Sequence, residues 1–158
     1  MISPLKKKID LAQIPVQGKF GTQRKFDIHT GVDIYCNEGE KVYAMEAGTV
    51  INVSPFTGQL AESPWWNNTQ AVLIEGASGV ILYGELNPSV FIGQKIQEGD
   101  LLGTIMTVLK KDKGLPMTML HLELYSSGYR GDGEWWKDEK PPQLLNVESL
   151  LKKLTHKQ

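Results

Sequence analysis

The sequence predicts a mostly β fold, namely a compact antiparallel β-sheet or half-barrel domain with a short C-terminal helix. Short apolar runs rich in Val, Ile, Leu and Tyr recur along the chain with Gly or Asn between them, which is typical of strands joined by turns. Only one segment, near the C-terminus, carries clear helix signals. At 158 residues the chain is expected to form one domain with a core of ordinary size.

The chain divides into three parts. Residues 1–18 have little periodicity and form an N-terminal lead-in, residues 19–151 form the domain proper, and residues 152–158 form a C-terminal tail. Strands are predicted within the domain at Val32–Tyr35, Lys41–Met45, Thr49–Val53, Ala71–Glu75, Val80–Gly84, Leu101–Met106 and Leu120–Tyr125. Two long loops, 54–70 and 126–143, are expected between them.

The predicted helix covers Val147–Leu154. Asn146 is a natural N-cap, and Lys152 and Lys153 suit the negative C-terminal end of the helix dipole.

Charge and hydropathy exclude several classes of function. The formal net charge is -1 and the basic residues are spread along the chain, so nucleic acid is not an expected partner. No apolar run approaches the roughly 20 residues of a membrane-spanning helix. Leu5 is followed by Lys6, Lys7 and Lys8, which leaves no apolar core of a signal peptide. The chain is therefore expected to be cytoplasmic as it stands, or a trimmed extracytoplasmic protein; the oligomeric state is not predicted.

A candidate metal site is formed by His29, Asp33 and His121. The third histidine, His156, lies in the lysine-containing tail, where solvent is the expected neighbour. Residues i and i+4 share one face of an extended segment, so His29 and Asp33 can converge, and Gly31 between them permits a kink. Two imidazoles and one carboxylate suit Zn²⁺ and leave its fourth tetrahedral position open, as in catalytic sites.

Strand alternation places His121 on a polar face. Met119, Glu123 and Tyr125 share that face, while the intervening leucines face the core. Glu123 can then accept a hydrogen bond from the imidazole N–H of His121. The spacing alone leaves open that His29 and His121 are unrelated, because His-x-x-x-Asp is short and common.

Several motifs occur in a characteristic order. The chain contains Phe20-Gly21, then His29-Thr30-Gly31-Val32-Asp33-Ile34, then Gly-x-x-Val-x-Ala over residues 39–44 and Gly-x-Val over residues 48–50. A paired-glycine hairpin over residues 93–103 and Leu120-His121-Leu122-Glu123 follow. In this order they resemble the lysostaphin-type zinc endopeptidases, which cut peptide cross-bridges of bacterial peptidoglycan, over roughly residues 20 to 151.

The resemblance implies a fold, a metal and a ligand class. His29, Asp33 and His121 would bind one Zn²⁺ ion on the floor of a groove across the sheet. The partner would be a peptidoglycan peptide or another peptide or amide.

Two positions depart from the pattern of active members. Those members carry Tyr-x-His-Leu and His-x-His, whereas this chain has Glu85 and Met119 in place of the two auxiliary histidines. Such histidines direct N–H donors at developing negative charge, and a methionine thioether cannot donate. The approach to the last motif, residues 110–118, also lacks the usual glycine-rich pattern.

Two functional hypotheses follow. In the first, the chain is a zinc-binding member with lost or strongly altered peptidase activity that serves as a binding or regulatory module. In the second, it is an active zinc hydrolase with Glu85 as general base. Tyr83 and Tyr125 are candidate hydroxyl donors, though a packed strand tyrosine is the commoner role for each.

Two further features stay open. The pairs Trp65-Trp66 and Trp135-Trp136 could wall the groove, but loop tryptophans more often cap a small core. The segment Ala44–Gly48 also resembles biotinyl or lipoyl carrier domains, whose carrier lysine is absent because position 46 is Glu.

Overall fold

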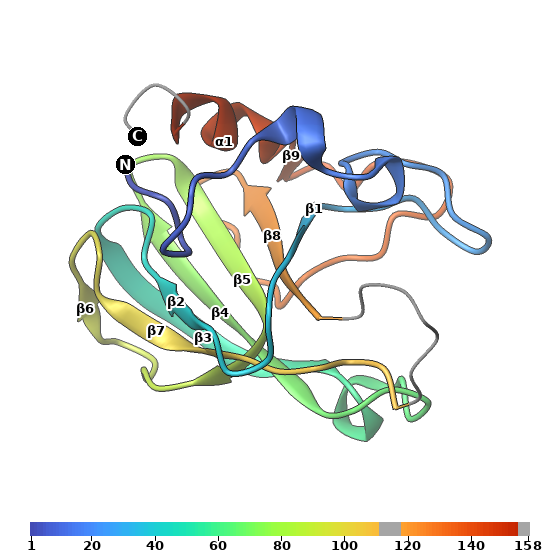
Figure 1. The fold of residues 1–158 in the computed structure, drawn as a ribbon, viewed down its shortest axis with the longest axis horizontal. Helices are drawn as coiled ribbons and strands as arrows, with labels where there is room; N and C mark the ends of the chain where they lie inside the picture. The colour runs from blue at the N-terminus through green and yellow to red at the C-terminus, as the bar shows by residue number, and fades with distance from the viewer. Residues whose placement is uncertain (111–117, 155–158) are drawn as a thin grey trace.

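The structure, a computed structural model, describes residues 1–110 and 118–154. Its centre is a strongly curved antiparallel sheet, with helix α1 and the N-terminal segment packed along one side (Figure 1). The strands of the described residues are β1 Val32–Tyr35, β2 Lys41–Tyr43, β3 Gly48–Thr57, β4 Thr69–Gly76, β5 Gly79–Pro88, β6 Lys95–Ile96, β7 Leu101–Ile105, β8 Met119–Tyr125 and β9 Leu144–Leu145. The predicted mostly β fold with a C-terminal helix is confirmed.

Strand β5 organises the sheet. The main strand order is β1-β8-β5-β4-β3-β6, while β2 pairs with β7 and β9 pairs with β8. On the edge away from β4, strand β5 pairs first with β8 over Val80–Gly84 and then with β7 over Leu86–Pro88. The sheet therefore forks at Glu85, where the partner of β5 changes from β8 to β7.

The predicted loop 54–70 is partly wrong. Strand β3 continues to Thr57, and β4 already begins at Thr69. Pro55 misled the prediction, because proline cannot donate to a central ladder. Here it is tolerated because β6 pairs with β3 only at Gly48 and Thr49, which leaves the far end of β3 with β4 as its partner. The remaining loop contains the short 3-10 helix η3, Gln59–Ala61.

The main core lies between the sheet, helix α1 and the lead-in. Helix α1 spans Glu148–Leu154, begins with Asn146 Oδ1 accepting the Glu148 N–H, and buries Leu150, Leu151 and Leu154. The lead-in contains the short 3-10 helices η1, Leu11–Gln13, and η2, Val16–Gly18. Leu5 and Ile9 are buried in the same core, so the lead-in packs as part of the structure. His156 lies outside the described residues.

A smaller core lies on the opposite face of the sheet. It gathers Leu73, Leu82, Tyr125 and Tyr129 beneath the segment that follows β8. The Tyr125 and Tyr129 rings stack with their centroids 3.9 Å apart. Among the described helices, none is long and apolar enough to cross a membrane.

Candidate metal centre

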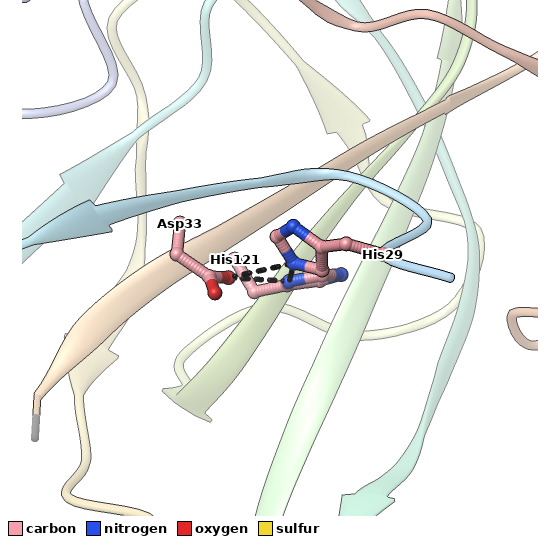
Figure 2. A group of neighbouring side chains, drawn as sticks. All are labelled: His29, Asp33 and His121. Atoms are coloured by element: carbon pink, nitrogen blue, oxygen red, sulfur yellow. Dashed lines mark hydrogen bonds and ion pairs between the residues drawn. The ribbon is translucent and has the colours of Figure 1, made fainter. Parts of the chain in front are cut away.

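Three side chains from two distant segments converge at one point. His29 lies in the loop before β1, Asp33 is on β1, and His121 is on β8, where it pairs directly with Asp33 (Figure 2). His29 Nε2 lies 3.2 Å from Asp33 Oδ1 and 3.4 Å from His121 Nδ1. His121 Nδ1 lies 2.7 Å from Asp33 Oδ1. All three residues are buried.

Gly31 makes the convergence of His29 and Asp33 possible. A Cβ atom on Gly31 would lie 1.9 Å from the backbone oxygen of Leu122, so only glycine lets this part of the chain approach β8. The sequence suggested a kink at Gly31; the structural requirement is this close approach. The two histidines therefore meet through backbone packing between two strands.

Hydrogen bonds fix which ring nitrogens face the centre. His29 Nδ1 lies 3.0 Å from the carbonyl oxygen of Lys19, which can only accept, so Nδ1 carries the hydrogen. His121 Nε2 lies 2.6 Å from Glu123 Oε2 and donates to it. The remaining nitrogens, Nε2 of His29 and Nδ1 of His121, both face Asp33 Oδ1. Once His121 Nδ1 gives up its proton, this arrangement presents two lone pairs and a carboxylate oxygen to one cation.

The donor set and its spacing fit Zn²⁺. Ligand atoms about 2.0 to 2.1 Å from a tetrahedral ion are separated by about 3.3 Å. The two distances from His29 Nε2 agree with this value. The third, between His121 Nδ1 and Asp33 Oδ1, is shorter because a proton held between these atoms forms a hydrogen bond.

Electrostatics at the centre favour a positive charge. Burial disfavours charge on His121, but hydrogen bonds with Asp33 and Glu123 outweigh it and raise the pKa of His121 to about 10. Burial likewise opposes ionisation of Asp33, yet hydrogen bonds from His121 and His29 hold its pKa well below its usual range. A proton thus occupies the position that suits a metal cation.

Glu123 anchors His121 from the same strand. Besides His121, its carboxylate accepts hydrogen bonds from Thr30 Oγ1 at 2.7 Å and from the Tyr125 hydroxyl at 2.5 Å. Burial alone would raise the pKa of Glu123, but the hydrogen bonds outweigh burial and lower it below its usual value. The carboxylate is therefore ionised. Tyr125 therefore supports Glu123 and is not among the residues that line the cavity beside the metal centre.

Glu85 stands at the fork of the sheet. Its φ of 71° is in the left-handed region, which is uncommon for a residue other than glycine. Its side chain lines an open cavity of about 680 Å³ that also contains His29, Asp33 and His121. Oε2 of Glu85 is buried and has no hydrogen-bond partner among the described residues. Burial and the nearby Asp33 charge raise the pKa of Glu85 to about 8.

Met119 and Phe56 complete the surroundings of His121. Met119, half-buried, lines the cavity two residues before His121, as alternation along β8 requires. The Phe56 ring lies 5.2 Å from the His121 ring. Gly84 allows this contact, since a Cβ there would lie 2.8 Å from the Phe56 ring.

The structure does not bring Tyr83 to the site. Its side chain is fully buried in the main core, and its hydroxyl accepts a hydrogen bond from the Met45 N–H at 3.0 Å. A bulge explains why Tyr83 and Glu85 face different ways. Gln70 and Val72 of β4 pair with Leu86 and Tyr83 of β5, so β5 has one extra residue and its alternation is reset.

The tryptophan pairs are split between two roles. Trp66 and Trp135 line the cavity, and Trp65 touches the Trp66 ring from outside it. Trp136 instead packs against Phe20, with ring centroids 5.5 Å apart, at the smaller core. One member of each pair thus belongs to the groove.

Sequence reasoning missed two partners of the centre. Arg24 Nη2 donates to Asp33 Oδ2 at 3.1 Å, which holds the carboxylate oxygen that faces away from the histidines. Thr30 holds Glu123 as described above. Both lie in irregular loops, where no periodicity indicates the direction of a side chain.

Comparison with known proteins places this geometry in a family. The sequence model of Peptidase family M23 matches residues 27–132, which contain all three residues of the candidate centre. Leukocyte cell-derived chemotaxin-2 of Bos taurus is 31% identical over 111 residues, which cover 67% of this chain and 66% of that protein. The chain thus matches just under two thirds of the length of this curated relative.

Solved structures show the same fold. CbpA from L. salivarius REN is 18% identical with a TM-score of 0.61, and the match covers 91% of this chain and 90% of that one. The catalytic domain of lysostaphin from Staphylococcus simulans is 14% identical with a TM-score of 0.59, covering 89% and 99%. The fold is therefore lysostaphin-like, and the chain belongs to peptidase family M23.

Proposed function

We propose that this chain is a zinc-binding peptide-recognition module of the M23 fold, with lost or strongly reduced peptidase activity. His29 Nε2, Asp33 Oδ1 and His121 Nδ1 hold one Zn²⁺ ion, and the cavity beside them receives a peptide. One observation carries the loss of activity: Met119 and Glu85 line the cavity where the family pattern has histidines.

The chemistry of those two side chains supports a binding role. When bound, zinc supplies a Lewis acid that polarises a peptide carbonyl. Hydrolysis also needs donors aimed at the negative charge that develops on that carbonyl oxygen, and Met119 offers none. Loss of one such donor costs about 10²- to 10³-fold in rate. Glu85, when ionised, adds negative charge where negative charge must build up.

The relatives support the same proposal. Membership in a peptidase family makes a peptide, such as a peptidoglycan cross-bridge peptide, the expected class of ligand. The bovine relative is named as a chemotaxin and not as a peptidase. A relative of this chain by sequence thus bears a name that does not refer to hydrolysis.

Metal analysis tests the zinc assignment. Purified chain, exposed to Zn²⁺ and freed of excess metal, is expected to retain about one ion per molecule by mass spectrometry. His121→Ala should abolish retention, whereas Asp132→Asn, on the rim of the same cavity, should retain zinc. Equal zinc contents in His121→Ala and the parent would refute the assignment.

A cleavage assay then tests the loss of activity. Zinc-loaded chain is incubated with peptidoglycan and with short glycine peptides, and released amines are measured. We expect no turnover above that of free Zn²⁺. Steady turnover by the parent would refute a purely binding role.

The second candidate is an active hydrolase with Glu85 as general base. The observation that favours it is the Glu85 side chain at the cavity, with Oε2 buried and unpartnered among the described residues and a pKa raised to about 8, which suits a base near neutral pH. Turnover that survives Met119→Ala and disappears in Glu85→Gln would establish this alternative.

A further inference from the structure

The rim of the cavity is acidic. Asp27, Glu62, Asp132 and Glu134 line it, in addition to Glu85 near the metal centre. Among the described lining residues, Arg24 is the only arginine or lysine, and its guanidinium is bound to Asp33 and to the Gln17 carbonyl oxygen. Among the lining residues that the structure describes, no free basic side chain therefore stands beside the rim carboxylates.

Glu85 provides a second and independent observation. Glu85 is only 8% exposed, and its Oε2 atom has no hydrogen-bond partner among the described residues. The other two buried carboxylates at the cavity, Asp33 and Glu123, are each held by at least two donors. A buried acceptor oxygen without a donor is costly, so a ligand that brings a donor to Oε2 of Glu85 gains free energy there.

We propose that the cavity recognises the primary ammonium group of a peptide, with Glu85 as its hydrogen-bond acceptor and the acidic rim as its attracting field. An ammonium group carries three donors and a positive charge, which match the unsatisfied acceptor and the field. A carboxylate or phosphate in contact with Glu85 and the rim carboxylates, away from the zinc ion, would meet negative charge. This inference rests on the proposed peptide-binding role and names the chemical class of the ligand.

The walls of the cavity indicate that a peptide, and not a small free amine, brings the ammonium group. Trp135 and Leu60 line the cavity and are 63% and 78% exposed, so apolar surface is open to solvent there. Apolar side chains or the methylene groups of a lysine can cover this surface and gain stabilisation by burial. The ammonium can come from an N-terminus or from a lysine side chain.

Three matched peptides test the proposal on the zinc-loaded full chain by isothermal titration calorimetry. Acetyl-Gly-Gly-Lys-Gly-Gly-amide carries a side-chain ammonium, and Gly-Gly-norleucine-Gly-Gly-amide carries an N-terminal one. Acetyl-Gly-Gly-norleucine-Gly-Gly-amide carries neither. We expect at least one ammonium peptide to bind about 10- to 100-fold more tightly than the neutral peptide, as a charge-assisted hydrogen bond allows. The stronger of the two identifies the source of the ammonium.

Two variants test the role of Glu85. In Glu85→Gln the ammonium peptide should bind no more than about threefold more tightly than the neutral peptide. This remaining preference comes from the rim carboxylates. Glu38→Gln, an exposed change of the same kind on the turn after β1, should keep the full preference. Retention of the full preference in Glu85→Gln would overturn the assignment of Glu85, and thermal melting establishes that each variant is folded.

The parent protein alone decides the ligand class. If it binds the neutral and ammonium peptides equally, this inference fails while peptide binding, the proposed function, stands. If none of the three peptides binds, both are overturned. Zinc content measured on the same samples reports on the metal assignment separately.

Discussion

Glu123 Oε2 accepts a 2.6 Å hydrogen bond from Nε2 of His121, two residues earlier on the same strand. Side chains two apart on a strand share a face, so β8 itself sets the orientation of the imidazole. Thr30 donates to the same oxygen, and Tyr125 donates to Oε1 on the other side of the carboxylate. The metal-facing nitrogen of His121 is thus positioned by a buried network based on β8, to which Thr30 of the loop before β1 contributes.

This network predicts that Glu123→Gln weakens zinc binding. Loss of the charged acceptor makes His121 a poorer and less well oriented ligand, and such outer partners are typically worth about 10- to 100-fold in metal affinity. A competitive chelator titration measures the change. Glu134→Gln is the matched control, because Glu134 accepts from Tyr129 and does not touch a histidine of the centre. Equal affinities in the two variants would contradict the role given to Glu123.

Zinc binding should release at least about one proton per ion at pH 7. In the metal-free protein the pKa of His121, raised to about 10 by its partners Asp33 and Glu123 against the effect of burial, keeps the imidazole protonated at pH 7. A metal ligand must offer a free lone pair, so the proton on Nδ1 leaves when zinc binds. Because protons compete, affinity rises with pH up to about pH 10. Calorimetry in buffers of different ionisation enthalpy counts the protons, and release of none would contradict the geometry.

Gly31→Ala should destabilise the protein severely. The new Cβ would meet the Leu122 backbone oxygen at 1.9 Å, and backbone cannot move aside cheaply. We expect a loss of about 3 kcal/mol or more in the free energy of unfolding, measured by urea denaturation. Gly39→Ala is the control: φ is +83° there but no atom lies within 4 Å of the new Cβ, so about 1 kcal/mol is expected. Similar losses in both would mean that the close approach is unimportant.

Regular strands were the most predictable part of the molecule. Alternation along Leu120–Tyr125 correctly predicted that the leucines face the core, and the spacing of His29 and Asp33 around Gly31 predicted their convergence. The fold followed because these patterns are local. The proximity of His29 and His121, which are 92 residues apart, is not a local pattern. Its prediction also relied on the order of the motifs along the chain.

Interruptions of regularity were not predictable in the same way. Tyr83 and Glu85 should share a face by alternation, but the extra residue in β5 and the positive φ of Glu85 separate them. Pro55 obscured the second half of β3, and Arg24 reaches Asp33 from an irregular loop. A bulge and a loop both depend on tertiary contacts, which a single sequence does not display.

Glu85 should make the metal-free protein less stable as the pH rises, and Glu85→Gln should remove this effect. Burial and the Asp33 charge raise the pKa of Glu85 from 4.5 to about 8 in the folded state, so the unfolded chain loses this proton first. Stability therefore falls as the pH rises from about 4.5, and the penalty becomes constant above about pH 8. At pH 9 the variant should be more stable than the parent by about 1 to 3 kcal/mol, whereas at pH 4 the two should be equal.

Urea denaturation in the presence of a chelator measures the stability at both pH values, with Glu62→Gln on the exposed rim as control. A parent as stable as Glu85→Gln at pH 9 would show that the carboxylate finds donors in solution. The expected gain would instead mean that the fold tolerates a destabilising carboxylate beside the metal centre, which is the usual mark of a residue kept for binding or catalysis.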